Sequence, residues 1–161
     1  MAKWKVVFVL ISGLLLTSVL NAAWISISPA ALRPSDSLAD SIVWHATPSE
    51  FYFETYAPYV VNVPLNLPDG VALKKFIIYV TDQSGPSNNI WVHIQRQSLA
   101  TGTVVSVATI TTMDLGSLTR AMLSRDLTAI TVNNSLYSYS LRINFDYAGS
   151  KMKFHGARIS Y

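Results

Sequence analysis

The sequence predicts an all-β protein: an antiparallel β-sandwich of about nine or ten short strands, with a jelly roll as one arrangement that fits. Large apolar residues alternate with polar ones in several segments, most regularly from Tyr137 to Phe145. This period of two is typical of a strand with one face on a core and one in water. Turn-forming residues separate these segments at regular intervals, and no segment shows a sustained helical pattern. Short, regularly spaced strands favour a sandwich.

The N-terminal segment has the layout of a secretory signal peptide. Two lysines precede an apolar run, Val6–Leu20, which ends in the small residues at 21–23. The run is shorter than the roughly twenty apolar residues that a membrane span needs. We therefore expect residues 1–23 to be the signal and residues 24–161 to be one exported domain. A retained N-terminal anchor is the alternative, because the residues before Ala22 and Ala23 match a cleavage site imperfectly.

Charge and cysteine content exclude some classes of protein. Without Lys3 and Lys5 of the signal, ten of the 12 basic residues remain against nine acidic ones, a net charge of +1. This balance predicts binding neither to nucleic acid nor to an anionic membrane surface. The chain has no cysteine, so its stability has to come from the core rather than from disulfides. Exported chains of this kind are common in prokaryotes, which favours a bacterial or archaeal source.

The expected domain begins with an extended arm, residues 24–41. Trp24, Ile25 and Ile27 belong to a short strand, and prolines and small polar residues follow it. We expect this strand to pair within its own sandwich, because intramolecular pairing avoids the entropic cost of association. The alternative is a donated strand, in which Trp24, Ile25 and Ile27 pair with the open sheet edge of a neighbouring molecule.

Further strand patterns follow along the chain. They occupy residues 42–44, 51–54, 59–65, 76–82, 90–97, 104–111, 127–132, 137–145 and 152–161. The polar loop between Asp82 and Ile90 predicts a hairpin of the two strands that it joins. A short turn likewise predicts a hairpin from Tyr137 to Tyr161, with a β-bulge at Gly156, where the alternation slips. Residues 113–126 fit either two helical turns or a loop.

Several short motifs occur in a fixed order over residues 57–161. They are Leu67-Pro68-Asp69-Gly70, Tyr79-Val80-Thr81-Asp82, Val92-His93-Ile94-Gln95-Arg96, the aromatic strand from Tyr137, and Gly156-Ala157-Arg158-Ile159-Ser160-Tyr161. In this order they resemble a β-sandwich domain of unknown function that recurs in exported bacterial proteins. The resemblance implies a β-sandwich and export, and it implies no catalytic residue, cofactor or ligand.

The chain offers no clear constellation of residues for catalysis or for a metal. His45, His93 and His155 lie on three different strands or strand ends, so we expect them to face solvent rather than to hold zinc. Neither a nucleophile motif nor two carboxylates in distinct settings can be found. The oxygen-rich Asp82–Asn89 loop is expected to be a simple turn, with calcium binding as the open alternative. We therefore predict a protein that is not an enzyme, with no catalytic, cofactor-binding or metal-binding residues.

Five aromatic residues form the candidate contact face: Trp44, Phe51, Tyr52, Phe53 and Tyr56. Strand neighbours point to opposite sides, so these rings cannot all face the core. Exposed rings bury protein interfaces or stack on sugars. The sequence therefore predicts a non-catalytic structural or assembly protein of the cell surface or extracellular matrix, which acts through β-edge and aromatic contacts with copies of itself. The alternative is a secreted carbohydrate-binding module with a surface glycan as its partner.

Overall fold

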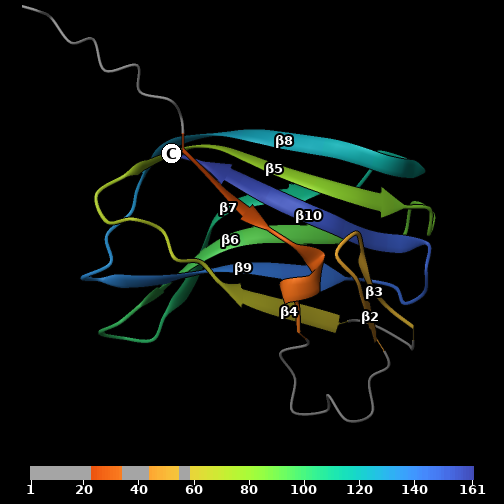
Figure 1. Cartoon of the computed structure of the whole chain (residues 1–161), viewed down its shortest axis with the longest axis horizontal. Coiled ribbons are helices and arrows are strands. Elements are labelled where there is room, and N and C mark those ends of the chain that lie inside the picture. Colours follow the sequence, from red (N-terminus) through yellow and green to blue (C-terminus); the bar gives the residue numbers. More distant parts are fainter. Residues whose placement is uncertain (1–22, 34–43, 55–58) are drawn as a thin grey trace, which may run out of the picture.

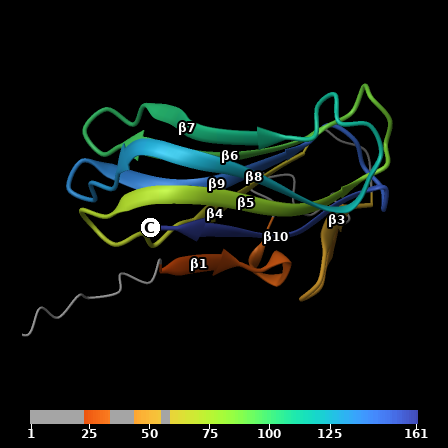
Figure 2. The same ribbon diagram turned by 90° about the horizontal axis from the view of Figure 1, so that it is seen from above.

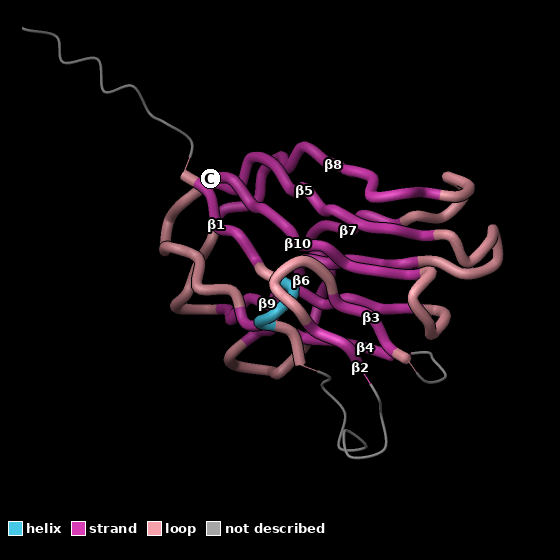
Figure 3. Tube along the Cα trace, turned by 45° about the vertical axis from the view of Figure 1, so that its right-hand side comes forward, coloured by secondary structure: helices cyan, strands magenta, loops and turns pink. Residues whose placement is uncertain are grey.

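The computed structural model describes residues 23–33, 44–54 and 59–161, and this part of the chain is an antiparallel β-sandwich. Its strands are β1 (Trp24–Ile27), β2 (Trp44–Ala46), β3 (Phe51–Phe53), β4 (Tyr59–Pro64), β5 (Ala72–Asp82), β6 (Ile90–Ser98), β7 (Val104–Thr111), β8 (Leu118–Thr131), β9 (Tyr137–Phe145) and β10 (Met152–Ser160). One short 3-10 helix, η1 (Pro29–Ala31), follows β1 and is the only helix in the described ranges (Figure 3). The predicted fold class is therefore confirmed.

The strands form two sheets that lie face to face (Figures 1 and 2). The six-stranded sheet has the order β2-β3-β10-β5-β8, with β1 paired to β10, and the four-stranded sheet has the order β4-β9-β6-β7. From β3 to β10 the chain crosses to the other sheet after every strand except β6, which is followed by its own neighbour β7. Such interleaving of two Greek keys is the jelly-roll arrangement.

Two predicted hairpins are wrong. The strands of each pair, β5 and β6 as well as β9 and β10, belong to opposite sheets, so each connecting loop crosses from one sheet to the other. Alternation shows which face of a strand is buried, and two consecutive strands can bury those faces equally well as a hairpin or across the sandwich. The hairpin predictions failed because the alternation of apolar and polar residues does not show which strand is the hydrogen-bonded neighbour.

The core lies between the two sheets and has an aromatic centre. Phe51 and Phe53 of β3 meet Phe145 of β9, and the centroids of the Phe53 and Phe145 rings are 5.4 Å apart at an angle of 81°. Such edge-to-face packing is favourable for aromatic rings. The surrounding buried side chains include Phe76, Ile78, Phe154 and Ile159 from the six-stranded sheet, and Val61, Ile90, Val92, Ile94, Leu141 and Ile143 from the four-stranded one.

Residues 113–126, whose sequence fits either two helical turns or a loop, are mostly strand. β8 begins at Leu118, whereas the sequence placed the start of a strand at Leu127. Its pairing with β5 is irregular at two places, and Arg120 has a positive φ of 46°. These irregularities shift the alternation of inward and outward side chains. β8 is also an edge strand, and Met122 on it is 60% exposed. Because β8 buries few apolar residues and its alternation is interrupted, apolar and polar residues do not alternate regularly in its sequence.

The N-terminal strand pairs within its own chain, as preferred above. β1 runs antiparallel to β10, from Trp24 opposite Ser160 to Ile27 opposite Ala157. The predicted bulge at Gly156 is confirmed, because the register of β10 against β5 shifts between Phe154 and Gly156. The structure thus places Trp24, Ile25 and Ile27 in an edge strand that is paired within its own chain.

Two predictions fall largely on residues that the structure does not describe. The expected signal segment, residues 1–23, lies outside the described residues except for its last residue, and so does the second part of the arm, residues 34–41. Within the described ranges, no helix is long and apolar enough to cross a membrane.

Candidate functional site

The candidate site is the outer face of the four-stranded sheet. Every second residue of β4, β9, β6 and β7 points away from the core, and the register brings these residues into rows across the strands. The rows are Val60, Asn144, Trp91 and Thr111; then Asn62, Arg142, His93 and Thr109; then Pro64, Ser140, Gln95 and Ser106; and finally Ser138, Gln97 and Val104. Amides, hydroxyls and one guanidinium therefore dominate the centre of this face.

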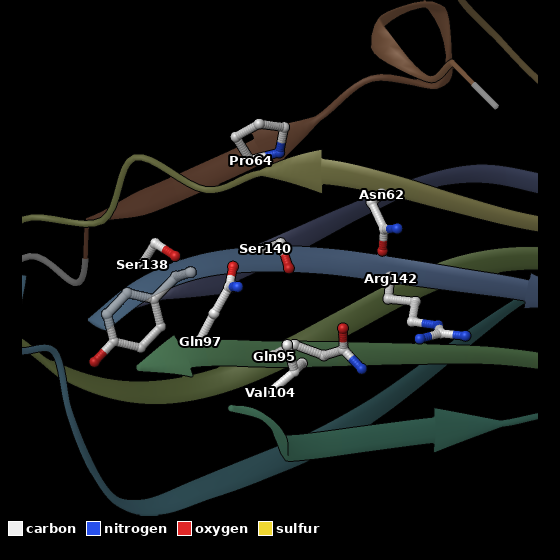
Figure 4. A pocket seen from close by; sticks show the side chains of 9 residues that line it. Asn62, Pro64, Gln95, Gln97, Val104, Ser138, Ser140 and Arg142 are labelled. Atoms are coloured by element: carbon white, nitrogen blue, oxygen red, sulfur yellow. The ribbon is translucent and has the colours of Figure 1, made fainter. Parts of the chain in front are cut away.

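A hollow of about 500 Å³ lies on this face, and we call it the polar groove (Figure 4). Its lining residues are Asn62, Pro64, Gln95, Gln97, Val104, Ser138, Tyr139, Ser140 and Arg142. Asn62, Arg142 and Gln95 come from the three neighbouring strands β4, β9 and β6, and Figure 4 shows them around one open space. Asn62 and Arg142, 80 positions apart in the sequence, thus lie on one surface.

Three polar side chains of the groove are hydrogen-bonded to residues outside its lining. Arg142 Nε donates to Asn144 Oδ1 at 3.0 Å, and Gln95 Nε2 donates to Ser106 Oγ at 3.4 Å. Gln97 Nε2 donates to the carbonyl oxygen of Gly102 at 3.3 Å. These bonds use one donor of each side chain, so the remaining guanidinium hydrogens and the amide oxygens can serve a ligand.

Two nearly parallel aromatic rings lie on the same face as the groove. Trp91 and His93, two residues apart on β6, are nearly parallel, with an angle of 7° and centroids 6.5 Å apart. His93 Nδ1 and Thr109 Oγ1 are hydrogen-bonded at 2.9 Å. Partial burial, and then the nearby Arg142 cation, lower the pKa of His93 below its ordinary 6.5. The imidazole is therefore neutral at neutral pH and presents an uncharged ring.

The predicted contact face is not one surface. Phe51 and Phe53 are buried in the core, with 0% and 1% of their surface exposed. Trp44 is half-buried and stacks on Phe51, and Tyr52 is half-buried on the opposite side of β3. Tyr56 lies outside the described residues. The alternation of β3 explains the separation, since it turns the two phenylalanines inward and Tyr52 outward.

Tyr52 belongs to a small polar cluster on the outer face of the six-stranded sheet. Its ring stacks on His45 with the centroids 5.0 Å apart, and Lys153 Nζ lies 5.4 Å from its centroid. Lys153 Nζ also donates to Glu50 Oε2 at 2.9 Å, and this hydrogen bond lowers the pKa of Glu50 below 4.5. The cluster thus already uses its charged groups internally.

The remaining candidate ligand groups are dispersed or internally bonded. His155 bridges Thr81 Oγ1 and the carbonyl oxygen of Ser49, each at 2.9 Å. In the Asp82–Asn89 loop, the buried carboxylate of Asp82 accepts hydrogen bonds from the Ser84 and Thr112 hydroxyls. Within the described part of the chain, no group of three or more acidic or histidine side chains could hold a metal ion. The Asp82 carboxylate thus fastens the turn through its own hydrogen bonds.

Sequence reasoning missed most of the groove. It placed His93 on the face opposite the core, which the structure supports, and the same alternation would have added Trp91, Gln95 and Gln97 of β6. The sequence did not indicate that β9 and β4 are the next strands, which bring Arg142 and Asn62 beside them. These two residues could be assigned only from the sheet order.

No protein-family model and no curated protein sequence matches this chain. Among solved structures, the chain is similar to the CBM22-1–GH10 modules of the Clostridium thermocellum endo-1,4-β-D-xylanase 10B, complexed with xylohexaose. The TM-score is 0.57 and the identity 10%, over 86% of this chain and 27% of that one, so this chain spans about a quarter of its length. It is also similar to the xylan-binding module CBM15, with a TM-score of 0.50 and 11% identity, over 87% of this chain and 97% of that one. At these identities the likeness shows the β-sandwich fold.

Proposed function

We propose that this protein is a non-catalytic carbohydrate-binding module that holds a polysaccharide on the outer face of its four-stranded sheet. The observation that carries this proposal is the polar groove on the same face as the parallel rings of Trp91 and His93. A sugar ring has hydroxyl groups at its edge and apolar C–H groups on its faces. Amides and a guanidinium hydrogen-bond the edge, while planar aromatic rings pack against the face. The groove and the Trp91–His93 pair offer both kinds of contact side by side.

The similar solved structures support this class of ligand. One is named a xylan-binding module, and another was solved with xylohexaose. Xylan is therefore the first polysaccharide to test. The outward residues of β6 run from Trp91 to Gln97, roughly 20 Å at about 3.3 Å per residue. That length fits several consecutive sugar units better than a single one.

The groove is suited to binding rather than to hydrolysis. Glycoside hydrolysis requires two carboxyl groups that flank the bond to be cleaved. None of the described residues that line the polar groove is aspartate or glutamate. The nearby Asp146 accepts hydrogen bonds from Trp91 Nε1 and from the backbone N–H of Asn89. Its carboxylate therefore holds the structure together at this end of the sheet.

Export is part of the proposal. The N-terminal segment has the layout of a signal peptide, and polysaccharides such as xylan are met outside the cell. The assembly function expected from the sequence gains no support, because β1 is paired within its own chain and the predicted aromatic face is divided between core and surface.

Affinity electrophoresis and isothermal titration calorimetry with soluble xylan, mixed-linkage β-glucan and mannan test the proposal. We expect the protein to bind at least one of them. The variant Arg142→Ala should lower the affinity about tenfold, because it removes a charged hydrogen-bond donor. Gln83→Ala is the matched control, since this exposed amide bonds to Thr119 at the edge of the other sheet.

Two results would contradict the proposed site. The first is that the protein binds none of the polysaccharides. The second is that Arg142→Ala binds as tightly as the unchanged protein while Tyr52→Ala does not, which would move the site to the six-stranded sheet.

A further inference from the structure

Arg142 is the only charged residue in the rows of outward residues on β4, β9, β6 and β7. The other members of these rows are amides, hydroxyls, apolar side chains, the Trp91 indole and the neutral imidazole of His93. None of the described residues that line the polar groove is aspartate or glutamate. The outer face of the four-stranded sheet therefore presents a single cation to a ligand and no anion.

The guanidinium of Arg142 has no carboxylate partner among the described residues. The two ion pairs found there belong to the six-stranded sheet and to the turn before β3. The first acidic residue after Arg142 is Asp146, four positions further on and roughly 13 Å away at about 3.3 Å per residue. Arg142 is half-buried, so it has lost part of its hydration without gaining an ion pair. An anion supplied by a ligand would therefore be stabilised there.

The donors around this cation suit a planar anion. Arg142 Nε donates to Asn144 Oδ1 at 3.0 Å, which orients the guanidinium and leaves the hydrogens of both Nη atoms for a ligand. Asn62 lies next to Arg142 on β4, and Gln95 lies one row further along on β6, so that all three surround one open space (Figure 4). The paired N–H groups of a guanidinium match the two oxygens of a carboxylate, and the neighbouring amides can add further hydrogen bonds.

We propose that Arg142 pairs with the carboxylate of a uronic acid unit in the polysaccharide that the polar groove binds. This inference rests on the proposed function and narrows its ligand to an acidic polysaccharide. A hydrogen bond between two charged groups is stronger than one from a guanidinium to a neutral hydroxyl. Because the face holds one cation, the ligand is a mostly neutral chain with scattered uronic acids, whose neutral units contact the amides and the rings.

The test compares a xylan that carries glucuronic acid side groups with the same preparation after chemical reduction of its carboxyl groups to alcohols. Calorimetry on the whole protein should show the acidic form bound roughly tenfold more tightly at low salt. This preference should shrink as salt is raised from about 0.02 M to about 0.5 M, because dissolved ions screen a partly exposed pair.

Two variants locate the origin of the preference. Arg142→Gln keeps an amide donor but removes the charge, so it should bind the acidic and the reduced xylan equally. Arg158→Gln is the matched control, because it removes the same charge from the other sheet, where the guanidinium lies 4.7 Å from the centroid of the Trp24 ring. This control should keep the preference of the unchanged protein.

The outcomes separate this inference from the proposed function. If the unchanged protein binds both forms of the xylan equally, or binds only neutral glucan or mannan, Arg142 does not select a uronic acid, while the proposed function stands. If Arg142→Gln keeps the preference, or Arg158→Gln loses it to the same extent, the preference does not arise at Arg142 and the inference is overturned. If no polysaccharide binds, the proposed function fails and this inference fails with it.

Discussion

The indole of Trp91 is hydrogen-bonded to Asp146, with 3.3 Å between Nε1 and Oδ2. The same carboxylate oxygen accepts a hydrogen bond from the backbone N–H of Asn89 at 3.2 Å. Asp146 follows the last residue of β9, whereas Asn89 and Trp91 lie at the start of β6, so one carboxylate joins the two strands at this edge of the candidate site. It also fixes the direction of the indole, whose plane is nearly parallel to that of the His93 ring. The orientation of the ring pair thus depends on a residue outside β6.

Replacement of Trp91 should reduce glycan binding more than any other single change on this face. Trp91→Ala removes the large planar surface, and we expect the affinity for the bound polysaccharide to fall by tenfold or more. Asp146→Ala should have a smaller effect, because the ring remains and only its orientation is released. Calorimetry measures both losses. Trp24→Ala is the control, since Trp24 is 38% exposed on the other sheet, and an equal loss in that variant would contradict the assignment.

His93 should make stability depend on pH. Burial and Arg142 lower its pKa in the folded state below 6.5, so the unfolded chain binds the proton more readily than the folded one. The contribution of His93 to stability is therefore complete above about pH 6.5 and is lost as the pH falls through the lower pKa of the folded state. Between pH 8 and 5 the melting temperature of the protein should fall further than that of His93→Gln.

A direct titration checks the cause of that effect. The imidazole C–H signals of the folded protein, followed by NMR, should give a pKa below 6.5 for His93. The His93→Gln variant identifies these signals among those of the three histidines. A measured pKa at or above 6.5 would refute the account in terms of burial and the Arg142 charge.

The core and surface aromatic residues of β3 should differ sharply in their effect on stability. Phe53→Ala leaves a cavity beside Phe145 and should lower the free energy of unfolding by about 3–5 kcal/mol. Tyr52→Ala, on the outer side of the same strand, should cost about 1 kcal/mol or less. Urea denaturation measures both. Similar midpoints for the two variants would show that Phe53 is not in the core.

Gly156 should be needed for the attachment of β1. Its φ is +137°, and a Cβ atom added there would lie 3.1 Å from the carbonyl oxygen of Ile27. Gly156→Ala should therefore cost about 1–3 kcal/mol and increase amide hydrogen exchange in β1 more than in β5. Gly70→Ala separates the two causes, because Gly70 also has a positive φ but no neighbour within 4 Å of an added Cβ. Equal exchange in β1 for both variants would argue against the steric contact.

Removal of β1 tests the intramolecular pairing. A protein that lacks residues 24–33 exposes one edge of β10, so it should be less stable and should associate through that edge. The chain that retains these residues should be monomeric in light scattering. The donated-strand alternative expects the opposite result, namely oligomers of the longer chain and a monomeric shorter one.

The sequence by itself determined the fold class and the inward face of most strands. In β9, Tyr139, Leu141, Ile143 and Phe145 are buried as the alternation predicts, and the slip at Gly156 marks a bulge that the structure contains. These features are local, because the period of a strand and the conformation of a glycine are set by residues next to one another in the chain. The places of the five aromatic residues from Trp44 to Tyr56 could not be predicted in the same way. Alternation shows that their rings divide between two faces, but it does not show which rings enter the core.

Only the tertiary structure decided which strands are neighbours. The sheet order placed β9 and β10 in opposite sheets, and it brought Arg142 and Asn62 beside Gln95. The turn at Leu99 likewise meets the turn at Leu136 through a backbone hydrogen bond. Pairing of strands that are distant in sequence is decided by how two apolar faces close over one core, and a single strand carries no record of that choice. The polar groove is therefore a property of the assembled sheet.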